Sequence, residues 1–251
     1  MVAGTDGATQ ATGVIDAATE RGVPLRLLGG LAVQVLTPDF PPRVRDDQDL
    51  DFVSVNTAKK PLMELFGGLG YQGDARFNTL HGEHQMYFRT PDGSRAVDVI
   101  MNQLTMCHTL EFKGRLDRMP YTLDVADLLL TKLQVVEQNE KDAQDIIYLL
   151  SAFEAVPGDE PGTIGLDRIA AVIGSDWGWW RTVTKNLDRV AELSDGPLRG
   201  LVPASALYDP AAQARALRAW ADTCPKTMRW KVRARVGERV RWYELPEEVG
   251  H

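Results

Sequence analysis

The sequence has few cysteines, no long apolar run and no excess of positive charge. Its two cysteines, Cys107 and Cys224, lie far apart without a CxxC partner, so we expect neither a disulfide framework nor a cysteine-rich metal site. No apolar stretch approaches membrane-spanning length, and the first residues lack the basic start and apolar run of a signal peptide. We therefore expect a cytoplasmic protein without a membrane partner.

The overall charge limits the kinds of partner that the chain can attract. Its formal net charge is −7 over 251 residues, so no global basic field draws in nucleic acid. Any binding to nucleic acid must use a local basic patch. A hydrophobic content of 44% and a charged content of 25% are ordinary for a globular protein. The length allows one large domain or two small ones.

Residues 27–53 carry the strongest signal in the chain. An apolar pair leads into Gly29 and Gly30, and the stretch ends in Asp49-Leu50-Asp51-Phe52. Side chains alternate along a strand, so the two aspartates project to one side and the two apolar residues to the other, toward a core. Neighbouring carboxylates repel unless they are neutralised, and Mg²⁺ takes oxygen ligands of this kind. The alternative is an exposed acidic turn in an unrelated α+β domain.

This pattern resembles the signature of the polymerase-β-like nucleotidyltransferase superfamily. The matching residues are Gly29 and Gly30, followed by Asp49 and Asp51. The spacer, residues 31–48, is longer than the family usually has, and its three prolines predict that the excess is a surface loop. The resemblance implies that the glycine turn approaches the triphosphate of an NTP. It also implies that the carboxylates hold catalytic Mg²⁺ or Mn²⁺.

A third carboxylate, Asp98, lies in the second of two alternating runs, residues 85–89 and 96–101. The segment between them, Thr-Pro-Asp-Gly-Ser, is a strong hairpin signal. A carboxylate inside an otherwise apolar strand needs a partner, because burial of an unpaired charge is costly. Given the resemblance, we predict that Asp98 is the third metal ligand or the base that activates the acceptor. The alternative is a solvent-facing residue on an edge strand.

Two helices are predicted downstream, over residues 125–138 and 141–153. Lys132 falls near the middle of the apolar face of the first helix, where lysine is rare because its charge must be desolvated or reach water. An anion bound in a cleft would explain it; the alternative is a lysine that snorkels to solvent. Asp142 lies on the shoulder of the apolar face of the second helix, and Asp145 lies outside that face.

These two helices resemble the segment after the catalytic domain in the nucleotidyltransferase-like toxins of abortive-infection and toxin–antitoxin systems. The resemblance implies that Lys132 contacts nucleotide phosphate and that Asp142 or Asp145 supports the site. Arg45 is a weaker candidate for the phosphate contact.

The segment 228–236, MRWKVRARV, alternates apolar and basic residues without a break. We expect a strand there, with a turn at Gly237 into a basic β-ribbon. The four basic side chains would then form a strip that follows the phosphates of an RNA acceptor; these are Arg229, Lys231, Arg233 and Arg235. The alternative is a solvated strand face.

Together these features predict an α+β protein. Residues 1–120 would form a nucleotidyltransferase core with a mixed β-sheet flanked by helices. Residues 121–251 would form a mostly helical region with a terminal β-ribbon. The implied activity is transfer of a nucleoside monophosphate from an NTP to a hydroxyl of RNA, a protein or a small molecule. A catalytically inactive binding or regulatory module with the same fold is the alternative.

Overall fold

The computed structural model describes residues 6–41 and 49–245, and these fall into two units. The first unit runs to Leu104 and takes in Glu111–Asp124. The second comprises Thr105–Leu110 and the chain from Val125 onward. Strands β6 (Gln103–Thr105) and β7 (Thr109–Glu111) pair as a hairpin where the chain passes between the units.

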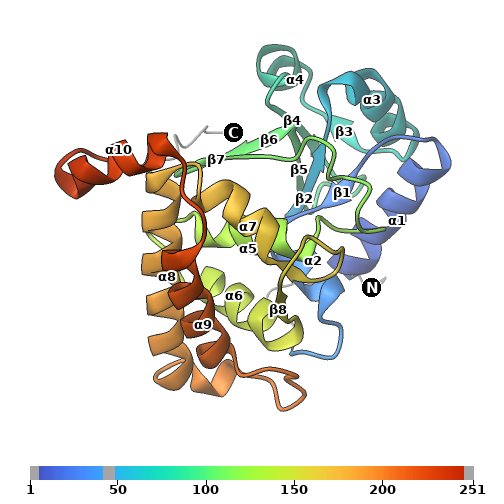
Figure 1. The fold of residues 1–251 in the computed structure, drawn as a ribbon. Coiled ribbons are helices and arrows are strands. Elements are labelled where there is room, and N and C mark those ends of the chain that lie inside the picture. Colours follow the sequence, from blue (N-terminus) through green and yellow to red (C-terminus); the bar gives the residue numbers. More distant parts are fainter. Residues whose placement is uncertain (1–5, 42–48, 246–251) are drawn as a thin grey trace. The chain divides into compact units, whose positions relative to one another are not determined.

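The first unit is built on a five-stranded mixed sheet in the order β1-β2-β5-β4-β3 (Figure 1). Strands β2 and β5 pair in parallel, while the other pairings are antiparallel. The sheet and its flanking helices confirm the predicted α+β class. The elements are α1 (Gly7–Glu20), β1 (Arg26–Leu27), α2 (Gly29–Leu36), β2 (Leu50–Ser54), η1 (Asn56–Ala58), α3 (Lys59–Gly68), β3 (Gln72–Gly73), α4 (Ala75–His81), β4 (Gln85–Arg89) and β5 (Ala96–Met101).

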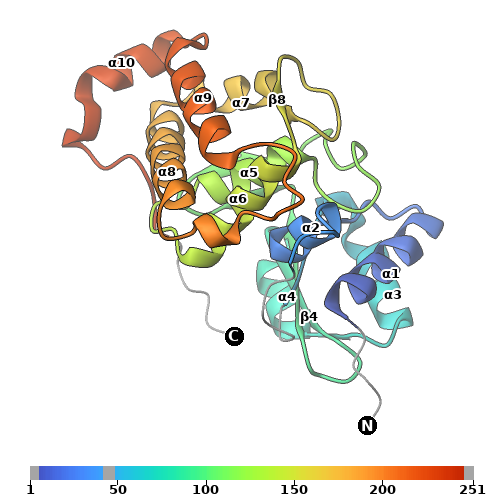
Figure 2. The same ribbon diagram turned by 90° about the horizontal axis from the view of Figure 1, so that it is seen from below.

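One face of this sheet forms the core of the first unit. Leu50 and Phe52 of β2 are fully buried on it, as their alternation with the aspartates predicts. Phe66 of α3 stacks on Phe88 of β4 at 4.4 Å and meets Phe52 edge-on at 6.1 Å between ring centroids. Helices α1 and α3 lie side by side in both ribbon views (Figures 1 and 2). A slip of one residue in β2 would turn an aspartate into this core, so the burial of apolar side chains fixes the register.

The second unit is mostly helical, as predicted. Within it, α8 lies beside α9, and the Trp180 indole N–H donates to the Ala221 carbonyl of α9 (Figure 1). None of the helices in the described part of the chain is long and apolar enough to cross a membrane. The elements are α5 (Val125–Leu133), α6 (Glu140–Ala152), β8 (Ala155–Val156), β9 (Ile164–Gly165), α7 (Leu166–Ile173), α8 (Trp177–Asp195), η2 (Arg199–Leu201), α9 (Pro210–Thr223), α10 (Met228–Val236) and η3 (Gly237–Arg239).

Helix α5 is five residues shorter than its apolar pattern suggests. It ends at Leu133, and side chains satisfy carbonyl groups at and just beyond its end. The Asn186 amide donates to the carbonyls of Leu133 and Val135 at 2.7 and 2.8 Å, and Gln138 donates to that of Lys132 at 3.2 Å.

The prediction of a terminal β-ribbon was wrong, because residues 228–236 form α10. Arg, Lys, Ala and Met are strong helix formers. Thr227 caps the helix by accepting from the Trp230 N–H, and Gly237 at φ +61° ends it. Alternation of apolar and basic residues over nine positions favoured a strand, but that pattern alone does not say whether a partner strand is present to pair with it.

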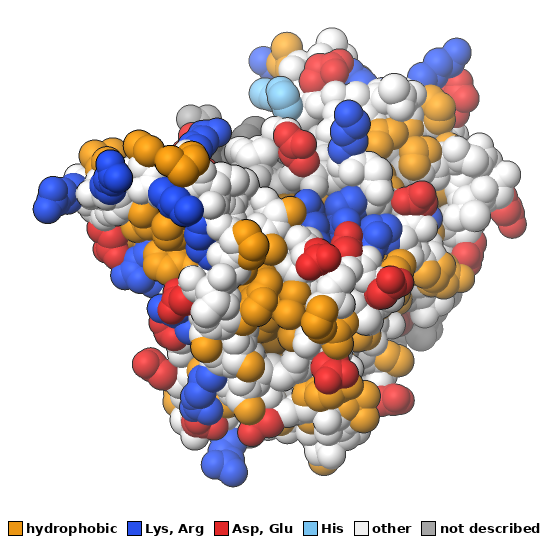
Figure 3. Space-filling model, in the orientation of Figure 1, with side chains coloured by type: hydrophobic (Ala, Val, Ile, Leu, Met, Phe, Trp, Pro, Cys, Tyr) orange, Lys and Arg blue, Asp and Glu red, His pale blue; other side chains and the backbone are white. Residues whose placement is uncertain are grey.

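The helical geometry also breaks up the expected basic strip. Residues four apart share a helix face, so the four basic side chains fall on two faces. Arg229 and Arg233 lie on one face, and Lys231 and Arg235 lie on the other. A third face is apolar and exposed, formed by Met228, Val232 and Val236. Figure 3 accordingly shows hydrophobic and basic side chains together over α10.

Candidate active site

The structure places Asp51 and Asp98 directly opposite each other in the parallel pairing of β2 with β5. In-register residues of paired strands share a face, so the two carboxylates lie on the same side of the sheet, opposite the Phe52 core. Both residues are half-buried, and Asp49, just before β2, is exposed. Two of the three predicted carboxylates are thus neighbours because of strand pairing alone.

The predicted glycine turn packs against this pair. Gly29 opens α2 with φ +74°, a left-handed conformation that favours glycine. A Cβ atom at Gly29 would overlap the Asp51 carboxylate, so the close approach also requires glycine. The Leu28 N–H donates to the Asp51 carbonyl at 2.9 Å and ties the turn to β2.

The start of α2 suits an anion. Leu28 is its N-cap residue and supplies no capping hydrogen bond from its side chain. The first amides of a helix have no partner within the helix, and the positive end of the helix dipole lies there. Gly30 is the second residue of α2, so neither of the first two positions carries a side chain that would screen these amides.

The sequence did not point to Gln85. Its amide donates to the Asp98 carboxylate at 2.5 Å from the neighbouring strand β4. Tyr87 pairs with Asp98, so Gln85, two residues before it, projects from the same face. The predicted pairing of β4 with β5 could have identified Gln85, because it is a polar residue at the start of β4 on the same face as Asp98.

The donor chemistry of these residues fits a divalent cation. Across residues 6–41 and 49–245, no three His, Cys, Asp or Glu side chains gather closely enough to form a complete metal site. Asp51 and Asp98 nevertheless supply two oxygen donors of the kind that Mg²⁺ and Mn²⁺ take, and adjacent like charges favour a bound cation. Arg45 lies outside the described residues.

In the second unit, the structure brings together Lys132, Asp142 and Asp145. The Lys132 ammonium lies 3.2 Å from Asp142 Oδ1 and 2.9 Å from Asp145 Oδ2. The Asp145 side chain is 1% exposed, against 14% for Lys132 and 16% for Asp142. These ion pairs give a structural reason for a lysine on the apolar face of α5.

Comparison with known proteins gives structural similarities only. No protein-family model matches the chain, and no curated protein matches it significantly. Among solved structures, the lincosamide antibiotic adenylyltransferase LnuA, bound to lincomycin, is 18% identical over 57% of this chain and 96% of its own, with a TM-score of 0.42. The antibiotic-resistance factor ANT(2'')-Ia is 13% identical over 92% and 98%, with a TM-score of 0.40.

A third similar structure is an antigenic nucleotidyltransferase-like protein from Paracoccidioides brasiliensis. It is 14% identical over 84% of this chain and 97% of its own, with a TM-score of 0.42. Because all three TM-scores lie below 0.5, the function proposed for this chain rests on its own side chains.

Proposed function

We propose that the protein is a metal-dependent nucleotidyltransferase that moves a nucleoside monophosphate from an NTP to a hydroxyl acceptor and releases pyrophosphate. One observation carries the proposal: Asp51 and Asp98 stand in register on parallel strands, with the Gly29 turn packed against Asp51. An acidic turn in an unrelated domain would not need this arrangement.

Each group in the site has a defined task in this reaction. Asp51 and Asp98, together with Asp49 two residues before Asp51 in the chain, would hold Mg²⁺ or Mn²⁺, which neutralises phosphate charge when bound. The amides at Gly29 and Gly30 bind and orient the triphosphate. Asp98 also accepts the proton of the acceptor hydroxyl, and Gln85 holds its carboxylate in position.

The contacts of Lys132 and Asp142 support a structural role better than a catalytic one. The family resemblance assigns Lys132 to the phosphates, yet two carboxylates already face its single charge. A phosphate would have to compete with both for the ammonium group. We therefore propose that Lys132 and Asp142 mainly hold the second unit together.

The acceptor class follows from a labelling experiment. The protein is incubated with NTPs labelled at the α-phosphate, Mg²⁺ or Mn²⁺, and separate acceptor pools of RNA, protein and small molecules. We expect label to enter one pool, and Asp51→Asn or Asp98→Asn to lower the transfer rate at least about 100-fold, the size seen when one preorganised electrostatic contact is lost.

The control is Glu64→Gln, which removes one exposed carboxylate from α3 in the same unit and should leave the transfer rate unchanged. Metal should add to the rise in melting temperature that NTP gives the parent protein, but it should add nothing in the Asp51→Asn variant. If NTP binds equally well to both proteins and no pool is labelled, the chain is a binding module and the proposed transfer is refuted.

A further inference from the structure

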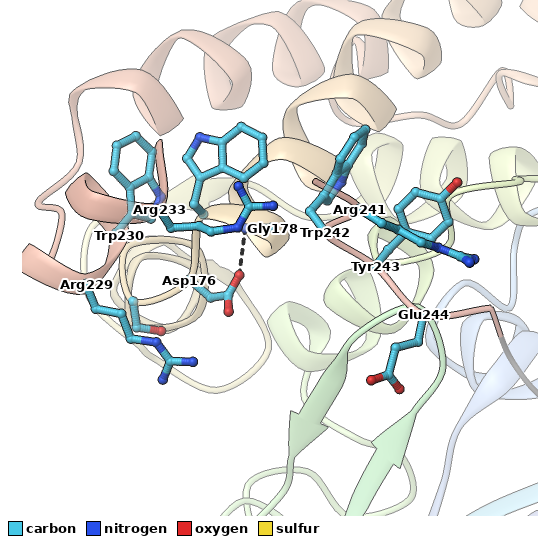
Figure 4. A pocket seen from close by; sticks show the side chains of 11 residues that line it. Asp176, Gly178, Arg229, Trp230, Arg233, Arg241, Trp242, Tyr243 and Glu244 are labelled. Atoms are coloured by element: carbon cyan, nitrogen blue, oxygen red, sulfur yellow. Dashed lines mark hydrogen bonds between the residues drawn. The ribbon is translucent and has the colours of Figure 1, made fainter. Parts of the chain in front are cut away.

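A pocket of about 310 Å³ lies wholly within the second unit. Its walls come from the start of α8, from α10 and from the segment after η3 (Figure 4). Ligand pockets generally begin near this volume, which suits one small organic group. The proposed transfer reaction does not use this pocket.

The pocket walls are rich in tryptophan. Trp177, Trp230 and Trp242 line it, which is half of the six tryptophans in the chain. Trp230 and Trp242 are partly exposed, whereas Trp177 is buried, and Tyr243 stands beside Trp242 (Figure 4). Aromatic side chains of this kind stack on the planar rings of nucleic-acid bases.

The same walls carry three arginines, of which one has a structural task. Arg233 lies over the Trp177 ring at 4.7 Å and donates to the carbonyls of Gly237 and Val240 at 2.7 and 2.8 Å. These contacts hold α10 to the segment that follows it. Arg233 therefore shapes the pocket and is not the main group that would meet a ligand.

The other two arginines, Arg229 and Arg241, are exposed. The Arg241 guanidinium lies over the Tyr243 ring at 4.8 Å. Two carboxylates also line the pocket. Asp176 accepts from the Gly178 and Trp179 amides and so caps α8, while Glu244 is exposed. The lining thus carries an excess of positive charge, although the chain has a net charge of −7. Because Asp176 occupies the first amides of α8, an anion in the pocket would meet the arginines instead.

We propose that this pocket binds a nucleotide, with the base against the tryptophan rings and the phosphate against Arg229 and Arg241. Arginine is well suited to phosphate because its planar fork donates two parallel hydrogen bonds. The ligand is either a free mononucleotide or one nucleotide of a single-stranded RNA, and both present the same chemistry.

Tryptophan fluorescence tests the proposal directly, because all six tryptophans lie between residues 177 and 242, in the second unit. The full-length protein is titrated with adenosine monophosphate, with a 12-nucleotide single-stranded RNA and with ribose 5-phosphate. We expect saturable quenching by the first two and at least tenfold weaker binding of ribose 5-phosphate, which has no base. Tenfold tighter binding of the RNA than of the mononucleotide identifies RNA as the ligand, and equal affinity identifies the free nucleotide.

A charge-matched pair of double variants separates the pocket from a general basic field. Arg229→Gln with Arg241→Gln removes two positive charges from the pocket. Lys231→Gln with Arg235→Gln removes two from α10 outside it. We expect at least a tenfold loss of affinity in the first variant and less than a twofold loss in the second, with unchanged unfolding midpoints in both, since these side chains are exposed.

Three results would overturn the proposal: no saturable quenching, equal binding of ribose 5-phosphate, or equal losses in the two double variants. The pair Asp51→Asn and Asp98→Asn should leave the quenching intact. Failure of the nucleotide pocket and failure of the proposed transfer reaction are therefore distinguishable.

Discussion

Replacement of Lys132 by methionine tests what the ion pairs between α5 and α6 contribute. The apolar face of α5 alone would suggest that loss of the charge is neutral or stabilising. The structure reverses this expectation, because the change leaves Asp145, whose side chain is 1% exposed, without the ammonium group 2.9 Å away. We therefore expect Lys132→Met to destabilise the protein.

The magnitude follows from the burial of the three side chains. Removing one partner of a fully buried ion pair costs about 3–5 kcal/mol. Lys132 and Asp142 are 14% and 16% exposed, so water relieves part of the penalty. We expect a loss near the lower limit, about 3 kcal/mol, which is a large fraction of the 5–15 kcal/mol typical of a domain.

Urea unfolding of a small set of variants measures this loss. Adding Asp145→Asn to Lys132→Met removes the buried negative charge that Lys132 faced and should recover about 2 kcal/mol of the loss, a coupling within the range for contacting residues. Asp142→Asn alone, which leaves the buried pair intact, should cost no more than about 1 kcal/mol. A Lys132→Met protein within 0.5 kcal/mol of the parent, or a double variant with no recovery, would refute the reasoning.

Two further predictions concern the second unit. Burial lowers the pKa of His108 to about 4, against a smaller raising effect of Asp176, while its Nε2 lies 2.8 Å from Thr182 Oγ1. Between pH 4 and the unfolded pKa of 6.5, the unfolded chain binds more protons than the folded protein. The contribution of His108 to the free energy of unfolding is therefore complete above pH 6.5 and falls by about 3 kcal/mol toward pH 4. His108→Gln should flatten this fall when the free energy of unfolding is measured against pH. A Cβ at Gly178 would lie 2.6 Å from the Trp242 carbonyl, so Gly178→Ala should lower the free energy of unfolding by about 1–3 kcal/mol and change tryptophan emission. Gly13→Ala, which meets nothing within 4 Å inside α1, should instead raise the free energy of unfolding by about 0.5–1 kcal/mol, and equal effects of the two alanines would contradict the steric argument.

The sequence was most informative where one strong periodicity was bounded by clear turn residues. Strands β4 and β5 begin and end at the predicted residues, because a turn motif, Thr-Pro-Asp-Gly-Ser, lies between the two alternating runs. The burial of Leu50 and Phe52 opposite the carboxylates followed from alternation alone.

Failures arose where tertiary contacts decide the outcome. Alternation in residues 228–236 fits a strand, but a strand needs a partner, and helix propensity with caps at Thr227 and Gly237 prevails. The amide that binds the last carbonyl of α5 belongs to Asn186, more than fifty residues downstream, and no local pattern contains that information. The same holds for Gln85, whose contact with Asp98 depends on the register of β4 against β5.

The two carboxylates of the candidate site are held in different ways, and this decides what their variants report. The position of Asp51 is fixed by the burial of Phe52 beside it, by the Leu28 hydrogen bond to its carbonyl and by the missing side chain of Gly29. Asp51→Asn therefore changes charge and little else. The Asp98 carboxylate accepts a hydrogen bond from Gln85, so Gln85→Leu removes this positioning contact and leaves the charge of Asp98 intact. If both variants lose transfer, the reaction needs the position of the carboxylates as well as their charge.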